Sequence, residues 1–61
     1  MKEIISILTR RDHLTFNEAY ELVCECREEI LNACAEGRYW EAEDILADYL
    51  GLEPDYIMYL I

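Results

Sequence analysis

The sequence predicts one all-α domain over residues 1–61, a compact bundle of three to four helices around a long central helix at about residues 16–36. Thr15 is a favourable N-cap, and Glu18 follows three residues later, where its side chain can bond back to the Thr15 amide in a capping box. Gly37 can adopt the left-handed conformation that commonly ends a helix. Between these two signals, apolar residues recur at helical spacing, which predicts an amphipathic helix about 31 Å long at 1.5 Å per residue.

The central helix has an apolar face and an acidic face when its residues are projected at about 100° each. The apolar face is made of Phe16, Ala19, Tyr20, Val23, Cys26, Ile30, Ala33 and Cys34. The acidic face is made of Glu18, Glu21, Glu25, Glu28, Glu29 and Glu36. We therefore expect the first set to pack in the core and the second to face solvent.

Three shorter helices are predicted around this spine. The first covers residues 1–10, and a strand there is the less favoured alternative because an isolated strand would have no partner. The second covers residues 39–50 and ends at Gly51, another glycine stop. The third begins near Pro54, which suits the first helical position, and carries six apolar or aromatic residues at 56–61.

The charge balance restricts the partners that the protein can attract. Fourteen acidic residues against five basic ones give a net charge of −9. Such a surface repels phosphate, so we expect neither direct nucleic-acid binding nor docking on an anionic membrane. A protein partner with a basic surface fits the charge, and the high apolar fraction of 54% also favours self-association. The alternative is that the charge only keeps a small apolar protein soluble.

The cysteines predict a reducing, cytoplasmic location. Cys24, Cys26 and Cys34 are odd in number and all lie on the central helix, whereas a disulfide scaffold needs pairs on different elements. No secretion signal is visible, and no apolar run approaches the roughly 20 residues of a membrane span.

Neither a metal site nor an enzyme is expected, and no cofactor is implied. Cys24 and Cys26 point about 200° apart on a regular helix, so they cannot chelate one ion together. His13, the single histidine, lies some 16 Å of helix rise from Cys24, too far to activate it as a nucleophile.

Arg27 is an anomaly because it projects onto the apolar face of the central helix. We favour a buried structural ion pair with a carboxylate of a packing helix, since an unpaired buried charge is very costly. Glu43, Asp48 and Asp55 are the partners available. The alternative places Arg27 at an interface with another chain.

Two surfaces are candidates for binding a partner. The first is a row of carboxylates about 16 Å long at 1.5 Å per residue. It consists of Glu18, Glu21, Glu25, Glu28 and Glu29. The second is an aromatic and apolar set that would contact a partner or drive oligomerisation. It consists of Trp40, Tyr56, Tyr59 and Ile61. For each there is a structural alternative: the acidic row is a solvated face, Trp40 covers the end of the bundle, and residues 56–61 close the core.

Residues 42–57 resemble the ending of small uncharacterised proteins carried by phages and mobile elements of gut Firmicutes. The segments Leu14–Ala19 and Arg27-Glu28 are similar too, so the resemblance covers about two thirds of the chain. It implies no catalytic or binding residues. Small acidic phage proteins are often similar to inhibitors of host defence, of the anti-CRISPR or anti-restriction kind. The leading hypothesis is therefore a non-enzymatic acidic interaction module, with such inhibition of a basic nucleic-acid-binding protein as its specific form. The alternative is an assembly module that self-associates through its C-terminal segment.

Overall fold

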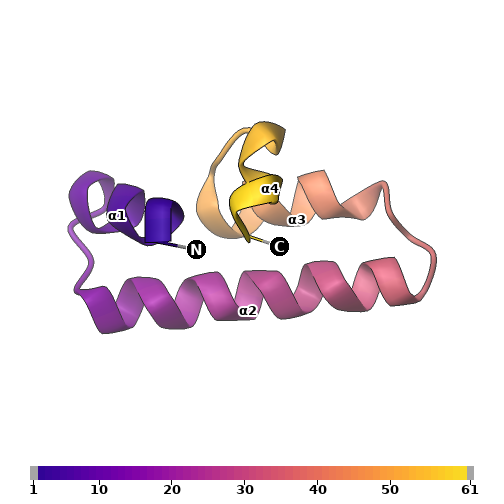
Figure 1. The fold of residues 1–61 in the computed structure, drawn as a ribbon, viewed down its shortest axis with the longest axis horizontal. Coiled ribbons are helices and arrows are strands. Elements are labelled where there is room, and N and C mark those ends of the chain that lie inside the picture. The colour runs from indigo at the N-terminus through magenta and orange to yellow at the C-terminus, as the bar shows by residue number, and fades with distance from the viewer. Residues whose placement is uncertain (1, 61) are drawn as a thin grey trace.

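The computed structural model describes residues 2–60 and confirms the all-α bundle with a long central helix (Figure 1). The elements are α1 (Lys2–Arg11), α2 (Phe16–Ala35), α3 (Glu41–Leu50), the 3₁₀ turn η1 (Pro54–Tyr56) and α4 (Ile57–Leu60). α2 runs along the length of a molecule that measures 34 × 18 × 16 Å. α1 and α3 lie on the same side of α2 toward its two ends, and η1 and α4 lie between them (Figure 1). The helical prediction for the first segment is confirmed, and the strand alternative was wrong.

The ends of α2 follow the signals in the sequence. The Glu18 amide donates to the Thr15 hydroxyl oxygen at 3.2 Å, and the Thr15 amide donates to the Glu18 carboxylate at 2.9 Å, so the capping box is complete. At the other end Gly37 has a φ of 80°, a conformation that side chains other than glycine rarely adopt. This turn lets the Arg38 amide reach back to the Ala33 carbonyl at 2.8 Å, which satisfies one of the last carbonyls of the helix.

One core joins all the helices. α2 contributes a narrow seam of buried residues, namely Ala19, Val23, Cys26, Ile30 and Ala33. The other helices cover this seam with Ile4, Ile5, Leu8, Ala42, Leu46, Leu50 and Leu60. Leu52, just past α3, packs on the same cluster. At about 25 cal/mol per Å² of apolar area, burying a side chain such as Leu46 contributes roughly 2 kcal/mol.

The apolar face of α2 is narrower than the sequence predicts. Phe16 and Tyr20 were expected in the core, but they are 64% and 49% exposed and stack on each other with ring centroids 6.3 Å apart. The reason is geometric: the other helices cover only the arc centred on the seam. Phe16 and Tyr20 lie about 60–100° around the helix from that centre.

α3 begins at Glu41, two residues later than predicted. Tyr39 and Trp40 belong instead to the turn between α2 and α3. Arg38 holds this turn, because its guanidinium forms ion pairs with Glu36 on one side and Glu41 on the other.

The connection between α1 and α2 holds a feature that the sequence does not indicate. His13 adopts a φ of 57°, a left-handed conformation unusual for a residue with a side chain. It reverses the chain direction between Arg11, the end of α1, and the Thr15 cap.

Candidate functional site

The surface of α2 that the other helices leave uncovered is the candidate functional site. Projection at about 100° per residue divides it into three rows around the buried seam. An acidic flank is formed by Glu18, Glu25 and Glu29. An outer row, opposite the seam, is formed by Glu21 and Glu28. An apolar flank, on the side away from the acidic flank, is formed by Phe16, Tyr20, Cys24, Arg27, Leu31 and Cys34.

The five carboxylates predicted as a binding surface are brought together on this uncovered side. All five are exposed. Among residues 2–60 the ion pairs are Arg11–Asp12, Arg38–Glu36 and Arg38–Glu41, so none of the five is neutralised within the described chain. Glu36, the sixth carboxylate of the predicted face, differs because Arg38 pairs with it. The acidic flank and outer row therefore present uncompensated negative charge along most of α2.

Glu18 contributes to the negative surface and also completes the capping box at the start of α2. The hydrogen bond from the Thr15 amide, together with that residue's side chain, lowers the pKa of the Glu18 carboxyl below its usual range. The capping box orients the Glu18 carboxylate. The other four carboxylates accept no such hydrogen bond from any residue in 2–60.

Glu25 and Glu29 lie at the edge of the uncovered surface, near enough to α3 for their charges to act on Tyr49. Partial burial raises the pKa of the Tyr49 hydroxyl, and the negative charges of Glu29 and Glu25 raise it further. Because those charges act on a phenol of α3, the acidic flank borders the junction between α2 and α3.

The structure corrects the prediction for Arg27. Its side chain is only partly buried, and it forms no ion pair with Glu43, Asp48, Asp55 or any other of residues 2–60. The buried seam is centred on Ala19 and Ile30, and Arg27 lies about 80° away from it, at the edge of the core. It therefore lies on the apolar flank, partly exposed to solvent.

Trp40 projects into solvent. It occupies the N-cap position of α3 and is 70% exposed, and Tyr39 beside it is 68% exposed. The alternative in which Trp40 covers the end of the bundle was wrong, because a side chain covering the core would be largely buried. Binding of a partner by Trp40 stays a prediction.

The C-terminal segment divides between the core and the surface. Leu60 is buried, whereas Met58 and Tyr59 are 75% and 45% exposed. Tyr56 packs partly on the core and its ring lies 5.9 Å from that of Tyr59. Ile61, the fourth member of the predicted set, lies outside the described residues.

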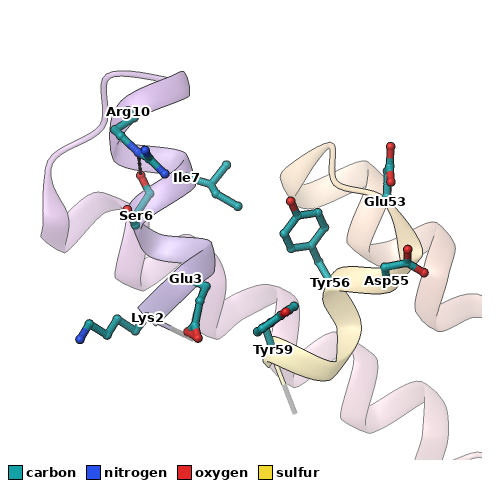
Figure 2. A pocket seen from close by; sticks show the side chains of 9 residues that line it. All are labelled: Lys2, Glu3, Ser6, Ile7, Arg10, Glu53, Asp55, Tyr56 and Tyr59. Carbon is teal, nitrogen blue, oxygen red and sulfur yellow. Dashed lines mark hydrogen bonds between the residues drawn. The ribbon is translucent and has the colours of Figure 1, made fainter.

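Tyr56 and Tyr59 line an open groove between α1 and the η1–α4 segment, with a volume of about 730 Å³ (Figure 2). Ile7 projects from α1 toward the space that the Tyr56 ring enters from the other side. The rim carries both signs of charge, from Lys2, Glu3, Arg10, Glu53 and Asp55. The sequence contains these residues but gives no sign that α1 and η1 will face each other, since that depends on how both pack on α2.

The cysteines form neither a metal site nor a disulfide within the described chain. Cys26 is fully buried, as predicted, and burial raises the pKa of its thiol to about 11. Cys24 and Cys34 are partly exposed and free. Among residues 2–60 there is no group of three or more His, Cys, Asp or Glu side chains arranged to hold a metal ion.

Comparison with known proteins finds no matching family model, no matching curated protein and no matching solved structure. Within residues 2–60, no helix combines the length and the apolar character needed to cross a bilayer.

Proposed function

We propose that this protein is a non-enzymatic binding module that presents the carboxylates of α2 to the basic surface of a protein partner. The observation that carries the proposal is the uncompensated charge on the uncovered side of α2. Five exposed carboxylates lie there, and no cation among residues 2–60 pairs with any of them. A rigid helix holds them at fixed spacing, so little order is lost when a partner binds.

A protein is favoured over a nucleic acid or a membrane because the net charge is −9. Phosphate groups of either would be repelled, while lysine and arginine side chains would be attracted over roughly a Debye length. Charge complementarity of this kind mainly accelerates association and selects the partner.

The specific form of the proposal is inhibition of a basic nucleic-acid-binding protein, such as a nuclease of a host defence system. Carboxylates in rows on one helix can occupy a groove that otherwise receives phosphates. The resemblance of residues 42–57 to small phage and mobile-element proteins supports this form. A cytoplasmic location goes with it, since the three unpaired thiols suit a reducing compartment.

The proposal is tested by capture of a partner from a lysate of the source cells, using three immobilised forms of the protein. The wild type is compared with Glu25→Lys/Glu29→Lys on α2 and with Asp44→Lys/Asp48→Lys on α3. Both double variants change the net charge equally at exposed positions spaced four residues apart. We expect a basic protein that the wild type and the α3 variant retain and the α2 variant loses. Equal retention by all three forms would contradict the proposal.

Assembly through the C-terminal segment is the second candidate, and the exposed Met58 and Tyr59 favour it. If chains associate there, Tyr56→Ala with Tyr59→Ala should shift the protein from oligomer to monomer in sedimentation equilibrium. An unchanged mass, with the helical circular dichroism retained, would exclude this role.

A further inference from the structure

The large apolar residues on the apolar flank of α2 lie outside the core cluster. Phe16, Tyr20 and Leu31 are 64%, 49% and 37% exposed, although each is large and apolar. Cys24 and Arg27 are partly exposed between them. Exposed apolar residues that continue along one helix commonly mark a contact with another chain.

The spacing of this flank is that of a helix-packing seam. Its central members are Tyr20, Cys24, Arg27, Leu31 and Cys34, separated by four, three, four and three residues. Side chains at alternating steps of three and four form the contact line of paired helices. α2 therefore carries two such seams, one buried in the core and one facing solvent.

We propose that the apolar flank binds the same flank of a second copy of this chain, with the two α2 helices antiparallel. The two-fold axis passes midway between Cys24 and Arg27, so each Arg27 faces Cys24 of the second copy. In this register Tyr20 lies against Leu31 of the second copy, and Phe16 lies against Ala35 of the second copy. The large apolar side chains Phe16, Tyr20 and Leu31 thereby each meet an apolar side chain, while Cys24 meets Arg27.

Charge complementarity identifies a second copy of this chain as the partner of the apolar flank. Arg27 is the one basic residue of α2 and has no ion-pair partner among residues 2–60. In the antiparallel register, Glu21 and Glu28 of the second copy lie about one helical turn on either side of its Cys24, so they flank Arg27. A second copy thus supplies both the apolar surface and the carboxylates that the flank lacks.

The same charges exclude the parallel arrangement. Parallel helices in register would place Arg27 against Arg27, with like charges at the centre of the contact. The antiparallel pair separates the two arginines and leaves the acidic flanks uncovered. Self-association therefore goes beyond the proposed function. It engages Glu21 and Glu28 of the outer row and leaves Glu18, Glu25 and Glu29 of the acidic flank free for another partner.

Sedimentation equilibrium of the full chain tests the proposal, with Leu31→Glu compared with the matched control Met58→Glu. Both replace an exposed apolar residue, so both should keep the helical circular dichroism of the wild type. We expect a wild-type dimer, a weakening of at least about tenfold for Leu31→Glu and little change for Met58→Glu. A monomeric wild type at millimolar concentration, no effect of Leu31→Glu, or equal effects of both variants would each overturn the proposal.

A charge exchange tests the role of Arg27. Arg27→Glu should weaken the dimer at least about tenfold, and adding Glu28→Arg should restore part of the loss. Arg10→Glu, on α1, makes the same charge change away from the flank and should have little effect. No recovery in the exchanged variant would overturn the assigned pairing.

Cross-linking with a short bifunctional maleimide tests the direction of the helices. The two Cys24 positions are offset by about 4.5 Å along the axes, and the two Cys34 positions by about 26 Å, at 1.5 Å per residue. Helix axes pack about 8–10 Å apart, so only Cys24 is within reach of its copy. Cross-linking should disappear in Cys24→Ser and persist in Cys34→Ser. Cross-linking that persists in Cys24→Ser, as parallel helices in register would give through Cys34, would overturn the antiparallel arrangement.

Discussion

Cys26 shows how burial decides the chemistry of a single residue. Its side chain is fully enclosed in the seam of α2, while Cys24 and Cys34 on the same helix are reached by solvent. Burial raises the pKa of the Cys26 thiol from near 9 to about 11, because the core disfavours the thiolate. At neutral pH this leaves about 100-fold less thiolate than in an unperturbed cysteine. Cys26 should therefore be the slowest of the three to react with a thiol reagent in the folded protein.

The raised pKa also predicts a loss of stability in alkaline solution. The unfolded chain releases the thiol proton near pH 9, whereas the folded chain keeps it until about pH 11. Deprotonation thus favours the unfolded state, so the contribution is fully present below pH 9 and is lost as pH rises toward 11. The loss should reach about 2–3 kcal/mol at 1.36 kcal/mol per pKa unit. Urea unfolding at pH 8 and 10.5 measures it, and Cys26→Ala should show a smaller decrease. An identical decrease in the variant would contradict this account.

Single residues could be predicted where the signal is local. The buried character of Cys26 and the capping box of Thr15 and Glu18 both follow from spacing along one helix. The positions of Phe16 and Arg27 could not be predicted in the same way. Periodicity gives the direction of a side chain around the helix, but the arc that is covered depends on where α1 and α3 pack.

At the scale of elements, Arg11 links the C-terminal ends of α1 and α3. Its guanidinium donates to the Leu50 carbonyl oxygen at 2.5 Å and to the Gly51 carbonyl oxygen at 3.3 Å. Asp12 holds the same guanidinium through two hydrogen bonds of 2.9 Å. Gly51 ends α3 with a φ of 62°, and the carbonyls of this turn then accept from Arg11. The positive charge also suits the negative end of the α3 dipole.

Arg11→Ala should lower the free energy of unfolding by about 1 kcal/mol, because the hydrogen bonds to two carbonyls are lost. Arg11→Lys should keep only part of this stabilisation, since an ammonium group lacks the planar fork that reaches both carbonyl oxygens and Asp12. Arg10→Ala is the matched control, because the Arg10 guanidinium donates to the Ser6 carbonyl of its own helix and to no other residue in the part of the chain that the structure describes. Its effect should stay within about 0.5 kcal/mol in urea unfolding. Equal effects of the two alanine variants would show that Arg11 does not link the helices.

Helix ends could be predicted from the sequence, whereas the contact that Arg11 makes between helices could not. The stops at Gly37 and Gly51 were predicted and confirmed, because a glycine signal acts within one turn. The contact from Arg11 to Leu50 joins residues 39 positions apart and leaves no local pattern. The later start of α3 at Glu41 has a similar origin, since the ion pairs of Arg38 hold Tyr39 and Trp40 in a turn.

At the scale of the whole molecule, one helix serves both the fold and the surface. α1, α3 and α4 all lie on the same side of α2 (Figure 1). Its seam is therefore buried, while its five carboxylates and the large residues of the apolar flank stay exposed. The all-α class and the long central helix could be predicted from periodicity and caps. The lateral arrangement of the short helices could not, and it determines the groove beside Tyr56 and the exposure of the apolar flank.

The uncovered acidic surface leads to the expectation of a salt-sensitive complex. With a net charge of −9, association with a basic protein should weaken as salt shortens the range of attraction. Reversal of two exposed charges within the contact should weaken binding further by at least about tenfold, whereas the same reversal elsewhere acts only through the net charge.

The most direct test is the dissociation constant of the captured partner, measured by calorimetry with Glu25→Lys/Glu29→Lys and with Asp44→Lys/Asp48→Lys. Binding through α2 predicts a loss of at least about tenfold for the first variant and less than about threefold for the second. Equal losses for the two variants, or a larger loss for the α3 variant, would contradict the assignment of the binding surface to α2.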